Sequence, residues 1–196
     1  VLASEPEEVV VEEEEVKEMP FVDVNKHWSK DYVTDLYNLG IVSGKDLTHF
    51  KPDDSITRAE FTKVIIGAFG IEIKDAEDIS TMPFTDVKAS NWYLPYVEAA
   101  KEEGLVGGYK DGTFKPDATI TRAEAMKIFL EAAGVDTAGA AKSTFKDVDQ
   151  KGWYAEYVNY AAENDIVKGY ADGTFGVDKN ISRAETAKIV SLMLAQ

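Results

Sequence analysis

Three arginines occupy the same place in a repeated five-residue motif. The motif reads Ile-Thr-Arg-Ala-Glu at residues 56–60 and 120–124, and Ile-Ser-Arg-Ala-Glu at residues 181–185. The first turn of a helix carries partial positive charge, so a cation there is mildly disfavoured. If the motif begins a helix, its arginine therefore needs either an acidic neighbour or an anionic ligand. The arginines concerned are Arg58, Arg122 and Arg183.

The residues around each arginine predict that helix. A Thr or Ser followed three positions later by Glu is the capping-box pattern, in which each side chain satisfies a backbone N–H group of the first turn. The predicted caps are Thr57 with Glu60, Thr121 with Glu124, and Ser182 with Glu185. A cation beside free N–H groups is a good site for a carboxylate. A structural salt bridge to a nearby acidic residue is the alternative, and the residues alone leave both open.

Aromatic side chains recur at two further places. Trp28, Trp92 and Trp153 precede the first predicted helix of each repeat, where a ring is either part of the core or a half-exposed platform for a sugar. Tyr109 and Tyr170 flank Asp-Gly turns, a position that favours contact with a ligand.

Metal binding and catalysis find little support. The Asp-Gly turns lack the further acidic positions and the closing Glu of a calcium-binding loop, so no metal or other cofactor is predicted. The two histidines, His27 and His49, both lie in the first repeat, and no Ser, His and acid grouping stands out. An enzyme with a repeated active site is therefore not expected.

The repeats themselves predict a mainly α fold. We expect three helix-loop-helix units at residues 21–75, 84–137 and 145–196, after a disordered acidic tail at residues 1–20. The first helix of each unit should end in a left-handed residue, at Gly40, Gly104, and either Asp165 or Asn164. The second should bury an apolar stripe, which in the last unit comprises Ile189, Val190, Met193 and Leu194.

The charge of the chain limits its partners. The net charge is −15; residues 1–20 hold eight Glu and one Lys, a net −7, which leaves −8 for the rest. Nucleic acid and anionic membrane surfaces are therefore not expected as partners, because both are bound through clustered Lys and Arg. Any anionic ligand must be held by a few local cations.

The recurring motifs resemble those of the S-layer homology (SLH) domain. These are the opening Phe-x-Asp-Val, the Trp and Tyr of the first helix, Gly-Tyr-x-Asp-Gly-Thr-Phe-x-Pro-Asp, and Ile-Thr-Arg-Ala-Glu. The resemblance implies one pseudo-threefold module with grooves between neighbouring units. It implies a non-catalytic, extracellular cell-wall anchor that binds secondary cell wall polysaccharide, often pyruvylated. The implied contacts are the three arginines, the three tryptophans, Tyr109, Tyr170, and the loop glycines Gly44, Gly108 and Gly169.

Departures from the family pattern predict unequal grooves. Lys45 replaces the loop Tyr in the first unit, and Gly176-Val177 replaces Lys-Pro in the third, so one groove should be weak or empty. Because the second unit has the most complete loop, we expect Arg122→Ala to weaken polymer binding with little loss of stability. The alternatives are a helical protein-interaction scaffold and binding to peptidoglycan itself. Self-association through a parent S-layer protein is a further expectation.

Overall fold

The computed structural model describes residues 18–195. Most of the predicted acidic tail, residues 1–17, lies outside the described residues. The described part is mainly α, as predicted, with short 3₁₀ turns and isolated β-bridges but no strand. Its helices are α1 (Lys30–Asn38), α2 (Arg58–Ala68), α3 (Leu94–Glu102), α4 (Arg122–Ala132), α5 (Ala155–Glu163) and α6 (Arg183–Leu194), with 3₁₀ turns η1 (Val22–Val24) and η2 (Ala76–Asp78).

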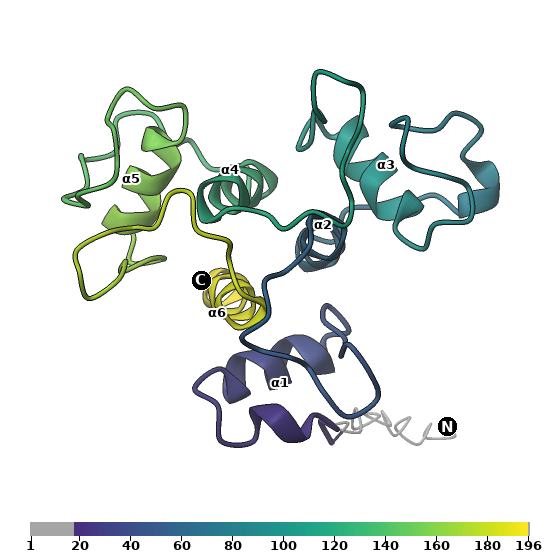
Figure 1. The fold of residues 1–196 in the computed structure, drawn as a ribbon, viewed down its shortest axis with the longest axis horizontal. Coiled ribbons are helices and arrows are strands. Elements are labelled where there is room, and N and C mark those ends of the chain that lie inside the picture. The colour runs from purple at the N-terminus through teal and green to yellow at the C-terminus, as the bar shows by residue number, and fades with distance from the viewer. Residues whose placement is uncertain (1–17, 196) are drawn as a thin grey trace, which may run out of the picture.

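The six helices form a closed ring of three lobes. Helices α2, α4 and α6 lie side by side at the centre, and α1, α3 and α5 lie outside them (Figure 1). Each central helix packs against the first helix of the next unit: α2 on α3, and α4 on α5. The last central helix, α6, packs on α1 and so closes the ring between the two ends of the chain. The expected pseudo-threefold module is confirmed.

Three backbone hydrogen bonds join the units at the centre of the ring. The Ile56 N–H donates to the Ile181 carbonyl (3.1 Å), Ile181 to Ile120 (3.1 Å), and Ile120 back to Ile56 (3.3 Å). Each isoleucine has at most 2% of its surface exposed. The residue before each cap therefore links all three units through its backbone while its side chain packs in the core.

The predicted capping boxes are present at all three central helices. The Glu60 N–H donates to Thr57 Oγ1, and the Thr57 N–H donates to Glu60 Oε2. The same reciprocal pair forms at α4 and α6.

The ends of the helices agree with the sequence except at the last residue of α6. Gly40, Gly104 and Asp165 take the left-handed conformation, with φ of 73°, 74° and 56°. Asn164 keeps a negative φ, so Asp165 is the strained residue of the two candidates. Leu194 was predicted to be in the core, but it is 41% exposed because it is the final residue of α6, at the rim of the bundle.

An aspartate in each unit fixes the loop that leads to the central helix. Asp147 Oδ1 accepts the N–H of Phe175 (2.7 Å), and its Oδ2 accepts those of Gly176 (2.7 Å) and Val177 (3.0 Å). Asp23 and Asp86 each accept two such N–H groups. The aspartate of the opening Phe-x-Asp-Val motif is therefore a loop clamp.

The clamp also perturbs the acidity of the carboxyl. Burial acts to raise the pKa of Asp147, but the backbone N–H donors outweigh burial and hold the pKa below its usual 3.8. The pKa of Asp23 is lowered in the same way.

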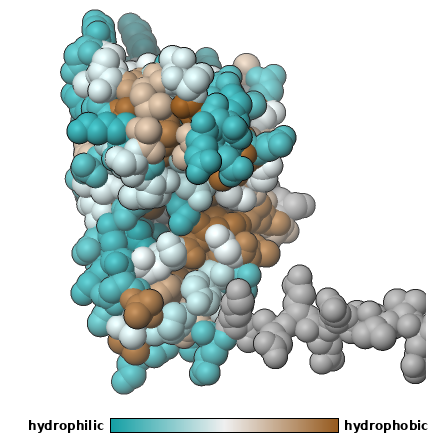
Figure 2. All heavy atoms as spheres, turned by 90° about the vertical axis from the view of Figure 1, so that its right-hand side faces the viewer, coloured by the Kyte–Doolittle hydropathy of each residue, from teal (hydrophilic) through white to brown (hydrophobic). Residues whose placement is uncertain are grey.

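The surface between these elements is mostly hydrophilic. Seen from the side of the lobes built on α3 and α1, hydrophobic residues gather in a few patches, one of them midway between the top and the bottom of the module (Figure 2). No helix in residues 18–195 is long and apolar enough to cross a membrane.

We predict that Asp147→Ala lowers the free energy of unfolding by about 2–3 kcal/mol at pH 7. The substitution removes the acceptor of three backbone N–H groups in a part-buried loop, which are costly to leave unpaired. Chemical denaturation measures the change. The exposed Asp178→Ala removes the same charge and should stay within about 0.5 kcal/mol of the wild type. Equal losses in both variants would show that net charge, and not the clamp, sets the effect.

We also predict that the stability gap between the wild type and Asp147→Ala depends on pH. Because the pKa of Asp147 is lower in the folded protein, its stabilising contribution is fully present above the usual 3.8. The contribution is lost as pH falls through the lowered, folded-state pKa. Denaturation curves should give a constant gap from pH 7 to pH 5 and a shrinking gap below about pH 4. A gap that stays constant at low pH would contradict the clamp.

Candidate functional site

Three grooves lie between the lobes, and each draws residues from all three repeat units. Groove 1, with a volume of about 250 Å³, is lined by Arg183, Lys45, Glu60, Lys63 and Trp92 among others. Groove 2, about 230 Å³, is lined by Arg58, Gly108, Glu124, Lys127 and Trp153 among others. Groove 3, about 530 Å³, is lined by Arg122, Gly169, Glu185, Lys188 and Trp28 among others.

The arginine of each groove comes from the preceding unit. Arg58 Nε donates to the Phe114 carbonyl (2.9 Å), and its guanidinium lies 5.0 Å from the centre of the Tyr109 ring. The loop of the second unit therefore surrounds Arg58 and not Arg122. The expectation that the most complete loop lies beside Arg122 is therefore wrong, because that loop lies beside Arg58.

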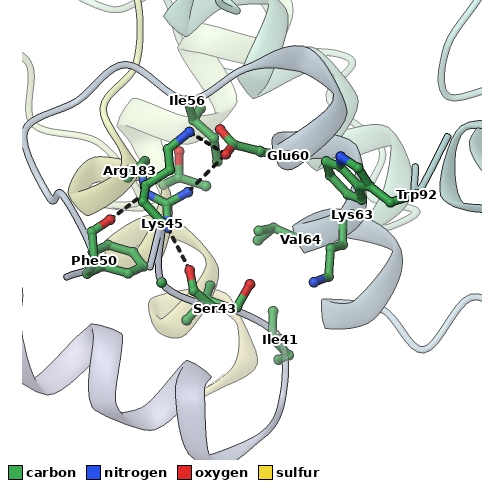
Figure 3. Close-up of a pocket in the computed structure, with 13 residues that line it drawn as sticks. Ile41, Ser43, Lys45, Phe50, Ile56, Glu60, Lys63, Val64, Trp92 and Arg183 are labelled. Atoms are coloured by element: carbon green, nitrogen blue, oxygen red, sulfur yellow. Dashed lines mark hydrogen bonds and ion pairs between the residues drawn. The ribbon is translucent and has the colours of Figure 1, made fainter. Parts of the chain in front are cut away.

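The other two arginines repeat this packing against their own neighbouring loops. Arg122 Nε donates to the Phe175 carbonyl (2.9 Å) and its guanidinium lies 4.9 Å from the Tyr170 ring. Arg183 donates to the Phe50 carbonyl (2.8 Å) and lies over the Phe50 ring, at 4.3 Å. Lys45, at the loop position of the missing tyrosine, lies instead beside Glu60 (Figure 3).

The expectation of free N–H groups at the start of each central helix is wrong. The N–H of Arg58 donates to the Ala118 carbonyl (2.8 Å), and that of Ala59 to the Pro116 carbonyl (3.0 Å). The next N–H, that of Glu60, is taken by the cap. The corresponding groups of α4 and α6 are occupied in the same way. These first-turn N–H groups are therefore not free to bind an anion.

The three guanidinium groups differ in how many nitrogens are already bonded. Arg183 uses Nη2 for the Ser43 carbonyl (2.7 Å) and has Nη1 3.6 Å from Glu60. Arg122 uses Nη1 for Glu185 (2.8 Å). Within the described chain, Arg58 has only its Nε bond and no carboxylate within 4.0 Å. The salt-bridge alternative therefore describes Arg122 and Arg183 but not Arg58.

The tryptophans are exposed on the groove walls. Trp28, Trp92 and Trp153 are 55–56% exposed, which fits a platform better than a core position. The Nζ of Lys63 lies 6.0 Å from the Trp92 ring centre, and that of Lys188 lies 5.9 Å from Trp28.

These lysines were missed in the sequence, although a signal was present. Lys63, Lys127 and Lys188 each stand five residues after the motif arginine, in the same register in all three units. Each also stands three residues after the capping glutamate, a spacing that places the two side chains on the same face of the helix.

Side chains that could hold a metal ion do not cluster anywhere in the described part of the chain. The structure does join one Ser, His and acid grouping that was not evident in the sequence. His27 contacts Ser29 Oγ (2.8 Å) and Asp53 Oδ1 (3.2 Å). Ser29 is fully buried, so its hydroxyl cannot reach a substrate, and the grouping is structural.

Comparison with known proteins agrees with this architecture. The family model described as "S-layer homology domain" matches residues 20–62, 83–126 and 144–187, one match for each unit. The chain belongs to the SLH domain family.

Relatives of this SLH module carry different names. A "Cellulosome-anchoring protein" of Acetivibrio thermocellus is 35% identical over 74% of this chain and 33% of its own length. An "Endoglucanase" of Bacillus sp. (strain KSM-635) is 32% identical over 89% of this chain and 19% of its own. An "S-layer protein" of Bacillus thuringiensis subsp. finitimus is 29% identical over 84% and 20%. The chain thus spans about a third or less of each of these relatives.

The loop glycines of the SLH module serve packing as much as they line a groove. A Cβ on Gly108 or Gly169 would overlap the ring of Phe84 or Phe145, and both glycines have positive φ. A Cβ on Gly44 would lie 2.5 Å from Phe21. The glycine therefore lets the aromatic ring of the opening motif pack beneath the loop.

The Gly176-Val177 departure is compensated within the third unit. Lys179 Nζ lies 4.0 Å from the centre of the Tyr170 ring, the same distance as Lys115 from Tyr109 in the second unit. A Cβ on Gly176 would lie 2.6 Å from the Tyr170 ring, so glycine makes room for that tyrosine. The loop of groove 3 thus keeps a lysine over its tyrosine.

We predict that Arg122→Ala lowers the free energy of unfolding by about 2 kcal/mol or more. This revises the expectation of little stability loss, because Arg122 is 6% exposed and its removal takes the side-chain donor from the Phe175 carbonyl and the charged partner from Glu185. Thermal and chemical denaturation measure the change. Lys127→Ala, in the same helix and partly exposed, should stay within about 0.5 kcal/mol of the wild type. Full stability of Arg122→Ala would restore the earlier expectation.

Proposed function

We propose that this SLH module anchors a larger surface protein to a Gram-positive-type cell wall, by binding anionic secondary cell wall polysaccharide in its grooves. The supporting observation is the repeated combination of an arginine, a lysine and a half-exposed tryptophan on a chain of net charge −15. Names of the relatives agree, since one is a cellulosome-anchoring protein and another an S-layer protein. The proposed location is therefore extracellular, in the cell wall or S-layer.

The chemistry of the grooves favours a sugar that carries a carboxylate. A pyruvate ketal supplies such a group, which arginine and lysine can bind through charge-assisted hydrogen bonds. An indole ring beside it offers an apolar face for the sugar ring. In groove 1, Arg183 and Lys63 lie on opposite sides of the hollow, and Trp92 forms its far wall (Figure 3). A polymer can contact both the cations and the ring.

Three grooves on one rigid ring also suit a polymer. When one groove holds a chain, the next repeat of that chain reaches a second groove at high effective concentration, so weak single contacts sum to firm attachment. No catalytic role is proposed for this region: the match to the endoglucanase covers 19% of that protein.

The alternatives make different predictions. A protein-interaction scaffold would use the same grooves for a soluble partner and would ignore wall polymer. Peptidoglycan binding would survive removal of the secondary polysaccharide.

We predict that the module sediments with purified Gram-positive sacculi and is released when the polysaccharide is removed by mild acid. Retention on stripped sacculi would identify peptidoglycan as the ligand. Absence of binding to both preparations would favour the scaffold.

The groove lysines provide the matched test. The triple variant Lys63→Ala, Lys127→Ala and Lys188→Ala should bind intact sacculi about tenfold more weakly or worse, because each groove loses a cation. The triple variant Lys88→Ala, Lys110→Ala and Lys151→Ala removes the same charge at exposed positions that line none of the three grooves. This control should bind within about twofold of the wild type. Equal weakening of both would point to non-specific charge attraction.

A further inference from the structure

The arginines of the three grooves differ in whether a glutamate of the chain already pairs with them. We infer that Glu60 and Glu185 act as built-in carboxylate competitors that occupy the arginines of grooves 1 and 3, and that groove 2 is the one open to an external carboxylate. This inference rests on the proposed binding of a carboxylate-bearing sugar, and it assigns the two glutamates a role beyond helix capping.

In groove 1 the glutamate contacts two cations, one of them the arginine. Glu60 Oε1 lies 2.5 Å from Lys45 Nζ and 3.6 Å from Arg183 Nη1, so one carboxylate oxygen faces two cations (Figure 3). Burial acts to raise the pKa of Glu60, but Lys45, the Thr57 N–H and Arg183 outweigh burial and lower it. Glu60 is therefore an anion at neutral pH, and it has the same chemical group as the proposed ligand.

In groove 3 the arginine is paired by one hydrogen bond to the glutamate, which is shorter than the contact between Arg183 and Glu60 in groove 1. Glu185 Oε1 accepts a hydrogen bond from Arg122 Nη1 at 2.8 Å and another from the Tyr170 hydroxyl at 3.2 Å. The Arg122 side chain is 7% exposed and the glutamate side chain 24%. A ligand carboxylate that takes the Nη1 hydrogen now bonded to Glu185 must displace this glutamate.

Groove 2 has the corresponding arginine and glutamate, Arg58 and Glu124, but the two do not form an ion pair within residues 18–195. Glu124 keeps its cap, with Oε2 accepting the Thr121 N–H at 3.1 Å, but within residues 18–195 it makes no ion pair with Arg58. Arg58 is held by its Nε bond and by two aromatic rings, so its position is fixed, while neither Nη atom has a partner among residues 18–195. A buried, positioned cation without a carboxylate is what an external carboxylate requires.

The capping box allows a substitution that separates the two roles of the glutamate. Glutamine also serves at this position of a capping box, because its carbonyl oxygen still accepts the N–H of the cap residue. Glu60→Gln and Glu185→Gln therefore keep the helix start but remove the negative charge that faces the arginine. Glu124→Gln is the matched control, because it makes the same change in a groove where, within residues 18–195, the glutamate makes no ion pair with the arginine.

Each groove also contains its own reporter. The chain has three tryptophans, with Trp92 in groove 1, Trp153 in groove 2 and Trp28 in groove 3. Their indole N–H signals, assigned through single Trp→Phe variants, can be followed by NMR during a titration. The probe is a methyl hexoside carrying a 4,6-pyruvate ketal, with the unmodified methyl hexoside as the carboxylate-free control.

In the wild type we expect the Trp153 signal to respond first, at about tenfold lower ketal concentration than the signals of Trp92 and Trp28. Glu60→Gln should strengthen the response of Trp92 about tenfold, and Glu185→Gln that of Trp28, each without moving the other two. Glu124→Gln should leave the affinity reported by Trp153 within about twofold.

Two results overturn the inference alone. One is that all three tryptophans respond at the same ketal concentration in the wild type. The other is that the ketal binds the wild type but its affinity does not rise in either Glu60→Gln or Glu185→Gln. A third result overturns the proposed ligand and the inference with it: no response to the ketal in any variant. Neutralising Glu60 or Glu185 removes a charge that faces an arginine, so a small loss of stability is expected in these two variants. Denaturation curves that stay cooperative, with no more than that small loss, show that any gain comes from the groove and not from a rearranged fold.

Discussion

The three-membered ring of isoleucine backbone hydrogen bonds is the constraint on which the rest of the module depends. Ile56, Ile120 and Ile181 each donate to one neighbour and accept from the other, so no unit satisfies its own bonds at the centre. Buried backbone groups must find partners. Each unit therefore needs both others in place. The caps, the loop carbonyls over each helix start and the arginine that reaches into the next loop all follow from that geometry.

The same interlocking explains the arginines. A guanidinium at a helix start is mildly unfavourable, but each one here donates its Nε to a carbonyl of the next unit and packs its flat face on an aromatic ring. A structural role and the proposed ligand contact are thus combined in one side chain. The Nε edge holds two units together, and the Nη edge faces the groove. What separates the grooves is whether a glutamate already occupies that second edge.

Local patterns predicted most of the fold, because helix starts and ends are local. The Thr-x-x-Glu boxes, the glycine ends and the left-handed Asp165 are set by residues within a few positions. The grooves were less predictable because their parts come from three different units. The N–H groups of Arg58 and Ala59 donate to carbonyls of residues 116–118, and no pattern near Arg58 in the sequence indicates this. Lys63, Lys127 and Lys188 could have been found, since they recur in register, but their place on a groove wall depends on how α2, α4 and α6 face the next unit.

The seam between the first and last units has a mechanical consequence. Grooves 1 and 3 both cross it, because one joins Arg183 to the loop at residues 41–45 and the other joins Trp28 to α6. Groove 2 is built only from residues 58–153. A load that pulls the two ends of the chain apart would strain the α1–α6 contact first and would loosen the two grooves on either side of it. Groove 2, whose arginine has no carboxylate partner among residues 18–195, lies on the far side of the ring from that seam and would stay intact under such a load.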